Sequence, residues 1–319
     1  LMISWPRGGI RREVCYRADQ IEGPYEKKVI LETPFGGLGA GVAQGTIFDT
    51  PEGDWYGIIF QDRDGLGRAP KLMPCTWIDG WPMLGDENGK VPEVMQKPVQ
   101  GQPVKGITKS DDFDSQELNL CWQWNHNPVD EAWSLTERPG YLRLKTNKVV
   151  ETIYTARNTI TQRMEGPQSS GVAALDLKGM KVGDKAGFSA FNSDAAVMTV
   201  ECREDGKYLV LTEESVKLHP RNKAVTDVKK EVIEEIPLKK DKIYLRIDAD
   251  FRPGETRDIA KLWYSLDNKE WNRMGGDYKM RFDWQRFFMG TKFAIFNYAT
   301  QEAGGHVDVD FFSYEKINN

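Results

Sequence analysis

The chain is poor in the residues that staple small proteins or ligate metals. Its 319 residues include four cysteines and three histidines: Cys15, Cys75, Cys121, Cys202, His126, His219 and His306. The cysteines form no C-x-x-C pair, and a chain of this length builds its core without disulfides, so we expect free, buried thiols. No histidine lies at metal-ligand spacing from another histidine or a cysteine, which argues against a zinc site.

Long apolar runs and an excess of positive charge are also missing. No apolar run approaches the roughly 18 residues that cross a bilayer, and 43 Lys and Arg against 48 Asp and Glu give a net charge of −5. Nucleic-acid binding requires a concentrated basic surface. The sequence therefore predicts neither a membrane nor a nucleic-acid partner.

The first residues, LMISW, contain no basic segment, apolar segment or cleavage site of a signal peptide. Because the chain opens on an apolar, strand-like segment, we expect further protein upstream of Leu1. The sequence leaves the compartment open between secreted, periplasmic and cytoplasmic.

Aromatic side chains are present in excess, with 10 Trp, 11 Tyr and 14 Phe. Aromatic residues dominate the burial of apolar surface in cores, and their flat faces also serve as platforms for sugar rings. Both explanations stay open at this point. The length, about twice that of a common domain, predicts two domains.

Short strands separated by turns fill the chain, and this rhythm predicts an all-β protein. Residues 1–85 read as strands between glycine-rich turns, including a hairpin of Ile47–Asp49 and Trp55–Phe60 around the turn TPEGD. The stretch 86–108 holds three prolines and several glutamines, which is typical of an extended linker.

From residue 109 onwards, turns recur about every 8–12 residues, as in a β-sandwich. The strands we expect there are Tyr141–Lys145, Thr152–Thr155, Gly171–Leu177, Gly187–Phe191, Ala196–Cys202, Tyr208–Thr212, Lys242–Asp250, Ala260–Ser265, Lys292–Tyr298 and His306–Tyr314. The apolar residues of Val225–Ile236 fit a helical face, but its neighbours are strands and Pro237 follows, so we interpret it as a strand. The predicted domains are 1–105 and 106–319.

Three stretches carry long, ordered motifs. The first is RADQIEGPYE at 17–26; the second runs from GTIFDTP at residue 45 to DGWP at residue 82; the third covers 113–144, with WQWNHNP, and ends in 293–298 and 307–312. Together they resemble the C-terminal part of glycoside hydrolase family 43, of the β-xylosidase and α-L-arabinofuranosidase type. The resemblance implies the C-terminal blades of a five-bladed β-propeller, followed by a concanavalin A-like β-sandwich, or jelly roll.

The resemblance also implies an activity. Family members invert configuration with a general base and a general acid, both carboxyl groups, which lie on earlier blades. The chain has two E-G-P triplets like that of the family's acid, but turn chemistry explains Glu22 and Glu165. We therefore expect no catalytic carboxylate here and place these residues upstream of Leu1. The whole would be an exo-acting glycosidase that removes xylose or arabinose from hemicellulose- or pectin-derived glycans.

Two partners follow from this reading: an oligosaccharide substrate, and an N-terminal propeller segment or chain that covers the open faces of a partial propeller, since a lone blade cannot bury its own faces. The alternative is a non-catalytic carbohydrate-binding or structural β-sandwich module. An extensive sandwich match favours neither; the propeller match favours the enzyme.

Four residues are candidates for substrate binding. Arg68 matches an arginine that reaches the sugar in relatives, and a guanidinium fork suits a hydroxyl-rich ring. Gln44 either donates to the substrate or holds the strand end, and Ala43 beside it stands where relatives carry a histidine near a metal. Phe288 matches a phenylalanine that walls off the active site in some relatives, with ordinary sandwich core as the alternative. Trp5, in place of an acidic residue of the family, is a candidate lining of the cleft.

Four carboxylates flank the first and last strands of the expected sandwich. They are Asp112, Asp114, Asp308 and Asp310. Sandwiches of this type often bind one structural calcium ion where those strands meet, and hard carboxylate oxygens suit that cation. The alternative is solvent-facing charge, since HVDVD alternates as a half-exposed strand does. The candidate cofactor is one structural calcium ion, and we expect no organic cofactor.

Overall fold

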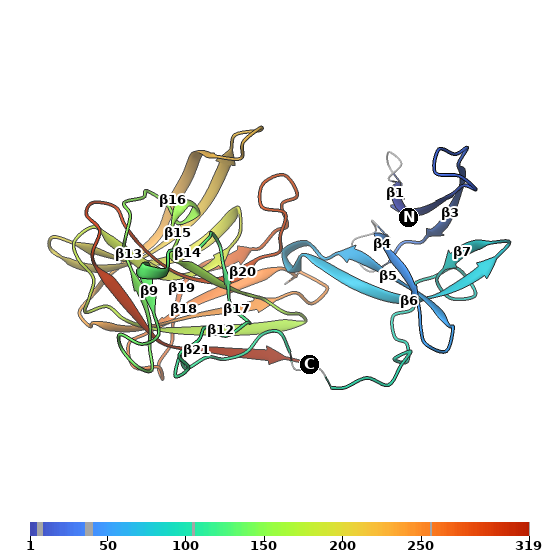
Figure 1. The fold of residues 1–319 in the computed structure, drawn as a ribbon. Coiled ribbons are helices and arrows are strands. Elements are labelled where there is room, and N and C mark those ends of the chain that lie inside the picture. The colour runs from blue at the N-terminus through green and yellow to red at the C-terminus, as the bar shows by residue number, and fades with distance from the viewer. Residues whose placement is uncertain (5–8, 36–40, 104–105, 256, 319) are drawn as a thin grey trace. The chain divides into compact units, whose positions relative to one another are not determined.

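The computed structural model describes residues 1–4, 9–35, 41–103, 106–255 and 257–318. These residues form antiparallel β-strands, with three short 3-10 helices among them (Figure 1). The chain divides into two compact units. The first unit comprises Leu1–Arg63 and Gly67–Val104, and the second comprises Asp64–Leu66 and Lys105–Asn319. No helix in the described ranges is long and apolar enough to cross a membrane.

The first unit contains a three-stranded sheet and a four-stranded sheet. The three-stranded sheet has the order β1 (Met2–Ser4), β2 (Arg12–Arg17), β3 (Glu26–Glu32), and the four-stranded sheet has the order β4 (Val42–Asp49), β5 (Trp55–Asp62), β6 (Arg68–Ile78), β7 (Trp81–Leu84). Each sheet is a meander of neighbouring strands, the form of a propeller blade. The predicted hairpin is confirmed: Asp49 pairs with Trp55, and the turn has Gly53 at φ +91°.

Strand β6 is 11 residues long and pairs with a different neighbour along each part of its length. It pairs with β5 through residues 68–74 and with β7 through residues 75–78. Pro70 and Pro74 both lie in the half that pairs with β5, opposite Phe60 and Tyr56. The core of the unit joins both sheets through Ile30, Leu31, Val42, Ile59, Met73, Cys75, Leu84 and Val91.

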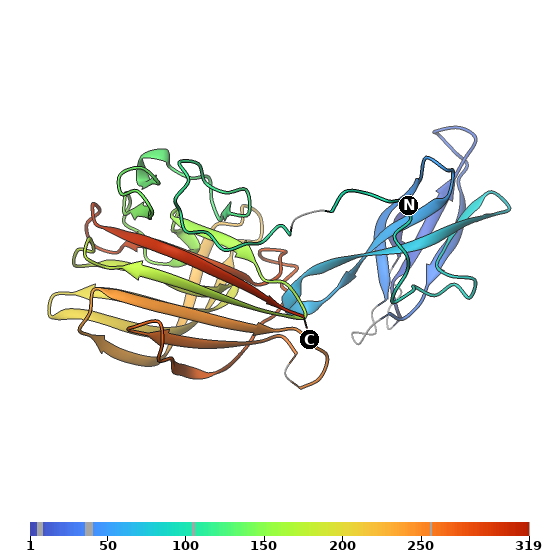
Figure 2. The same cartoon turned by 90° about the horizontal axis from the view of Figure 1, so that it is seen from below.

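The second unit is a sandwich of two seven-stranded sheets (Figures 1 and 2). One sheet has the order β19 (Asn272–Lys279), β18 (Ile259–Ser265), β17 (Lys242–Asp250), β12 (Gln168–Asp176), β21 (His306–Ile317), β10 (Leu142–Lys145), β9 (Trp133–Ser134). The other has the order β16 (Val225–Leu238), β15 (Gly206–Leu218), β14 (Asp194–Arg203), β13 (Asp184–Phe191), β20 (Lys292–Ala299), β11 (Thr159–Arg163), β8 (Gln123–Trp124).

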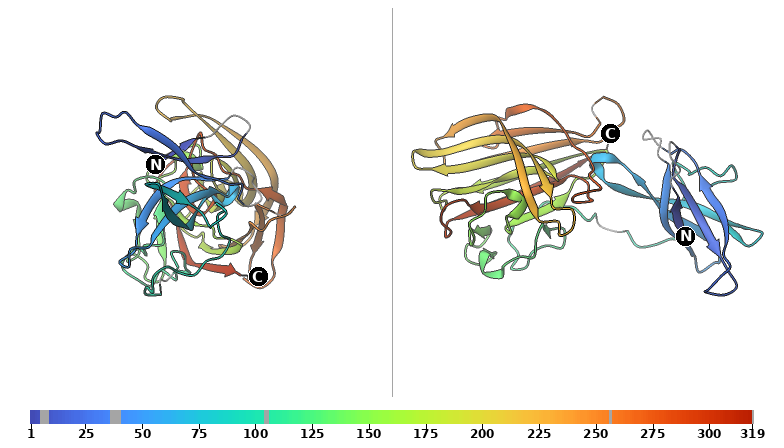
Figure 3. Two further views of the ribbon diagram at one scale, coloured as in Figure 1. Left: turned by 90° about the vertical axis from the view of Figure 1, so that its right-hand side faces the viewer. Right: turned by 90° about the horizontal axis from the view of Figure 1, so that it is seen from above.

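The two sheets are stacked face to face (Figure 3). The main core of the second unit draws its buried residues from strands of both sheets. Successive residues of β20 belong to different clusters: Phe293 and Ile295 join the inter-sheet core, whereas Ala294 and Phe296 join a second cluster. Because side chains alternate along a strand, the second cluster lies on the opposite face of that sheet. Tyr154 of the 3-10 helix η3 (Ile153–Thr155) belongs to this second cluster, which explains part of the aromatic excess by burial.

Most of the strands predicted for this unit are confirmed, including the ambiguous segment that forms β16. The strand predicted at Thr152–Thr155 is wrong, because the Thr152 hydroxyl accepts a hydrogen bond from the backbone of Tyr154 and starts η3 instead. Strands β8, β9, β11 and β19 were not foreseen. The remaining 3-10 helices are η1 (Asp64–Leu66) and η2 (Asp130–Ala132).

Among the strands that the structure describes, β16 lies at one edge of its sheet and pairs with β15 alone. It is 14 residues long and mostly exposed, and its register with β15 shifts at two places. Its exposed residues include both apolar and charged side chains, and Val232 is 62% exposed.

The four cysteines are free thiols, and only Cys75 is buried. Burial raises the pKa of Cys75 and of Cys121 to about 11 each. Both thiols are therefore protonated and unreactive near neutral pH.

Candidate functional site

The predicted substrate arginine lies in a cluster of charged side chains in the first unit. Asp62 ends β5 and Arg68 begins β6, and the two residues are cross-strand partners. Arg68 Nε donates to Asp62 Oδ1 at 3.3 Å, and Arg11 Nη1 donates to Asp62 Oδ2 at 2.7 Å. One carboxylate thus binds two guanidinium groups. We call Arg11, Phe60, Asp62 and Arg68 the arginine cluster.

The ring of Phe60 packs against the guanidinium of Arg68, the predicted substrate-binding arginine. The guanidinium carbon of Arg68 lies 3.8 Å from the centroid of the Phe60 ring, and that of Arg11 lies 5.7 Å from it. Phe60 and Asp62 project from the same face of β5, because side chains two residues apart share a face. A guanidinium stacked on a ring and hydrogen-bonded at Nε has little rotational freedom.

The two arginines of the cluster differ in their access to solvent. The Arg11 side chain is 2% exposed, and its Nη2 also donates to the backbone oxygen of Gly41 at 3.1 Å. The Arg68 side chain is 32% exposed. Arg11 therefore holds Asp62 in place, whereas Arg68 is a positioned cation that stays partly open to solvent.

Gln44 lies at an irregular point of β4. Its φ is +71°, and the register between β4 and β5 shifts between Val42 and Gly45. The backbone N–H of Gln44 donates to Glu13 Oε2 at 2.5 Å, while its side chain is exposed. The strand end is held through this backbone group, and a contact between the Gln44 side chain and a substrate stays a prediction.

Glu13 is a buried carboxylate that the sequence did not single out. It is fully buried in β2, and its Oε1 has no hydrogen-bond partner among the described residues. Burial raises the pKa of Glu13 above its ordinary value, against the lowering effect of the Gln44 N–H. Nothing in the segment REVCYR distinguishes Glu13 from a surface glutamate, because the bulge that buries both Glu13 and Val14 breaks the alternation.

The other two predicted substrate residues belong to different parts of the chain. Phe288 lies in the second unit, between β19 and β20, with φ +54° and 52% exposure. Its ring centroid lies 5.6 Å from that of Phe282. The alternative of ordinary sandwich core is therefore wrong for Phe288, and its role as an active-site wall stays a prediction. Trp5 lies outside the described residues.

The four predicted calcium ligands do not converge on one cation. Asp308 is buried, and both of its oxygens accept hydrogen bonds from arginines: Arg143 Nε at 2.7 Å and Arg138 Nη1 at 2.9 Å. Asp310 accepts from Lys242 Nζ at 2.6 Å. Asp112 and Asp114 are exposed, and no group of three or more His, Cys, Asp or Glu within the described ranges is placed to hold a metal ion.

Asp308 is instead the centre of an ion-pair network. Burial raises the pKa of its carboxyl, but the hydrogen bonds from Arg143 and Arg138 outweigh this effect and leave the pKa below its ordinary value. Arg138 also binds Asp176 at 2.8 Å, and its guanidinium lies 3.6 Å from the centroid of the Tyr141 ring. The interpretation of Asp308 as solvent-facing charge is thus wrong as well, since its side chain is 4% exposed.

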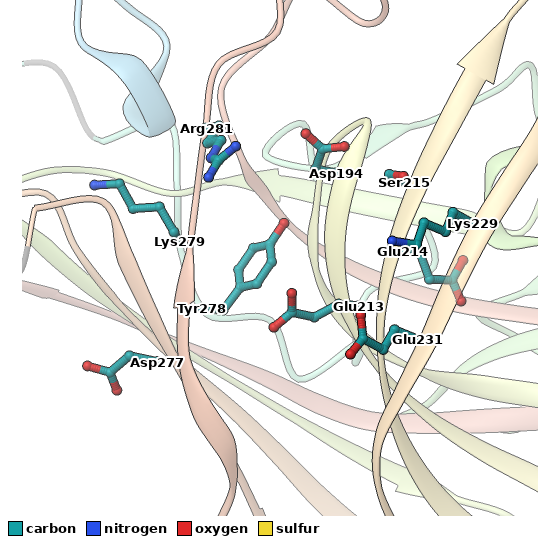
Figure 4. A pocket seen from close by; sticks show the side chains of 10 residues that line it. All are labelled: Asp194, Glu213, Glu214, Ser215, Lys229, Glu231, Asp277, Tyr278, Lys279 and Arg281. Carbon is teal, nitrogen blue, oxygen red and sulfur yellow. The ribbon is translucent and has the colours of Figure 1, made fainter.

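Two grooves of the second unit differ in their chemistry. The acidic groove, about 340 Å³ in volume, is lined by Glu213, Glu231, Asp277 and Tyr278, among others (Figure 4). Glu213 and Glu231 are cross-strand partners of β15 and β16. Their carboxylates lie close together in Figure 4, below the Tyr278 ring.

The cationic groove has a volume of about 780 Å³ and lies elsewhere on the same unit. Its lining includes Trp124, His126, Lys223, Arg286, Phe287 and Lys292, and contains no acidic residue.

Comparison with known proteins agrees with this architecture. The profile of the β-xylosidase C-terminal concanavalin A-like domain of glycoside hydrolase family 43 matches residues 110–315, which is most of the second unit. A β-sandwich of this kind is the C-terminal domain of this class of glycosidase. The chain belongs to glycoside hydrolase family 43.

Individual relatives match nearly the whole chain. A β-xylosidase of Formosa agariphila is 32% identical over 96% of the chain, which spans 53% of that protein. A solved structure described as a bifunctional GH43-CE protein of Bacteroides eggerthii superposes with a TM-score of 0.85 and 39% identity over 99% of the chain and 39% of its own length. A third, a GH43 enzyme engineered for endo-xylanase and exo-arabinofuranosidase activity, has a TM-score of 0.84 and 30% identity over 97% of the chain and 61% of its own length.

Proposed function

We propose that this chain is the C-terminal part of an inverting, exo-acting glycosidase that removes xylose or arabinose from hemicellulose- or pectin-derived glycans. The observation that carries the proposal is the arginine cluster. Asp62 and Phe60 fix Arg68 in one orientation, and a fixed fork of N–H donors matches the hydroxyl groups of a pentose.

In this proposal Arg68 binds the sugar, and the proton transfers belong to carboxylates outside these 319 residues. Glu22 is exposed in the turn between β2 and β3, and Glu165 pairs with Lys316 at 3.1 Å in the second unit. An N-terminal propeller segment or chain is the partner that supplies the catalytic carboxylates.

The proposal is tested by replacing Arg68 with Ala in the complete protein and measuring kcat/KM on aryl β-xylosides and aryl α-arabinofuranosides. Loss of a charged hydrogen bond to the sugar lowers transition-state binding by roughly 1.5–3 kcal/mol, which is about a 10- to 150-fold fall in kcat/KM. Arg12→Ala is the matched control, because Arg12 pairs with Glu32 on the surface of the same unit. Kinetic constants that match those of the control would remove Arg68 from the site.

A further inference from the structure

The cationic groove carries unbalanced positive charge in a chain whose net charge is −5. Arg286 does not account for it, because its guanidinium binds two carboxylates, those of Asp194 and Asp283. The unbalanced charge belongs to Lys223 and Lys292. Lys292 Nζ donates to the amide oxygen of Gln123 at 2.8 Å, and Lys223 Nζ donates to the backbone oxygen of Gln285 at 3.3 Å. Both acceptors are neutral.

No ion pair joins either lysine to a carboxylate within the described part of the chain. Lys292 also lies directly opposite Arg163 in the β11–β20 ladder, and like charges in that position destabilise a sheet. Burial, and then Arg163, lower the pKa of Lys292. An anion bound in the groove offsets both the burial of the Lys292 charge and its repulsion from Arg163.

The same groove offers surfaces that suit the carbon face of a sugar ring. Trp124 and Phe287 line it, and the Trp124 ring is held 5.5 Å from that of Trp133. Aromatic rings of this kind pack against flat apolar faces. His126 Nε2–H donates to the backbone oxygen of Tyr154 at 3.0 Å, so that in the neutral ring Nδ1 is left as an acceptor for a hydroxyl.

We propose that the cationic groove is a second carbohydrate site, built from residues of the second unit alone, that binds a uronic acid residue of the glycan. Its carboxylate pairs with the ammonium groups of Lys223 and Lys292, and its ring packs on the aromatic side chains. The carbohydrate nature of the ligand rests on the proposed function, whereas its negative charge rests on the groove alone. The site anchors acidic glycans without taking part in bond cleavage.

The experiment compares methyl β-D-glucuronide with methyl β-D-glucoside, which differ only in the carboxylate at C6. Binding of each to the full chain is followed by NMR line-shape and saturation-transfer titration. We expect the glucuronide to bind at least tenfold more tightly, with an affinity that falls as salt is added. Equal affinity for the two glycosides would overturn the proposal. Inorganic phosphate that displaces the glucuronide by binding the groove as tightly as the glucuronide does would overturn it as well.

The double variant Lys223→Gln, Lys292→Gln is expected to lose at least tenfold in glucuronide affinity. Because it removes the repulsion from Arg163, it is expected to unfold at the same temperature as the unchanged chain or above it. Lys229→Gln, which changes a lysine of the acidic groove, is the matched control and retains binding. Glucuronide binding that survives in the double variant would refute the assignment of the site.

The proposed function and the proposed second site can be rejected independently of each other. The double variant leaves hydrolysis of neutral aryl glycosides unchanged, and Arg68→Ala leaves glucuronide binding unchanged. A glycosidase test that fails while the glucuronide binds would reject the proposed function and leave an acidic-glycan-binding module.

Discussion

Each unit of the protein contains an aspartate bound by two arginines, Asp62 in the first and Asp308 in the second. The contacts are closely similar: hydrogen bonds of 2.7 and 3.3 Å to Asp62, and of 2.7 to 2.9 Å to Asp308. In each case one arginine also stacks on an aromatic ring, Arg68 on Phe60 and Arg138 on Tyr141.

The two clusters differ in solvent access. The Asp62 side chain is 27% exposed and the Asp308 side chain 4%. Asp308 joins β21 to β10 across the sequence, and both of its oxygens are used within the fold. Asp62 holds an arginine at the surface of its unit. The same combination of residue types therefore stabilises the fold around Asp308 and positions an arginine beside Asp62. The burial of the aspartate distinguishes the two roles.

The largest expected effect is on stability, from Asp308→Asn. Removing the buried charge leaves Arg138 and Arg143 without their shared partner, and because these arginines keep some contact with solvent, we expect a loss on the order of 2–4 kcal/mol in the free energy of unfolding. Denaturant titration of the second unit's unfolding transition measures it. Asp310→Asn, at a half-exposed pair, is the control with a loss below about 1 kcal/mol. A loss as small as that of Asp310→Asn would show that the ion pairs of Asp308 stabilise the fold no more than a surface ion pair does.

The next largest effect is on activity and distinguishes the two aromatic rings that stack on arginines, Phe60 and Tyr141. Phe60→Leu removes the ring below Arg68, and we expect kcat/KM to fall by about 2- to 30-fold, since a cation–π contact contributes roughly 0.5–2 kcal/mol. Tyr141→Leu makes the same change under Arg138 and is expected to leave kinetics unchanged. If both variants, or neither, lose activity, then the two clusters are not functionally distinct.

The smallest effect concerns pH, and the two units have opposite signs. Folding lowers the pKa of Asp308, so its contribution to stability is fully present above its unfolded pKa of about 4 and is lost as the pH falls below that value through the lower folded pKa. The pKa of Glu13 is raised, so its contribution is present below about pH 4.3 and is lost as the pH rises through its folded value.

Glu13→Gln tests the second sign. The amide oxygen still accepts from the Gln44 N–H, so at pH 7 the variant is expected to equal or exceed the unchanged chain in unfolding midpoint. Its advantage is expected to disappear near pH 4, in midpoints measured from pH 3 to 7. A variant that is destabilised at pH 7 would show that the Glu13 charge is stabilising.

The sequence predicted strands well where alternation or apolar runs were clear, as in Lys242–Asp250. It missed β19 because Gly275, Gly276 and several charged residues hide its pattern. The sandwich was recognised from long motifs, and its class is confirmed by the match to residues 110–315.

Site residues were harder to predict, because their roles depend on distant partners. Arg68 was found through resemblance, but nothing local to it indicates Arg11, which reaches Asp62 from 51 positions earlier in the chain. Phe60 and Asp62 had a usable signal, since they share one face of a hairpin strand opposite Arg68. Asp308 looked like a calcium ligand in the segment HVDVD. Arg143, which donates a hydrogen bond to its carboxylate, lies 165 positions earlier in the chain.

The edge strand β16 has a consequence for behaviour at high concentration. A long open edge with Val232 and Ile233 exposed is a template on which another chain can add a strand and start aggregation. Here Lys229, Lys230 and Glu231 interrupt the apolar surface, and the two register shifts bend the edge. The charges of β16 thus act as gatekeepers that keep copies of the protein apart in crowded solution.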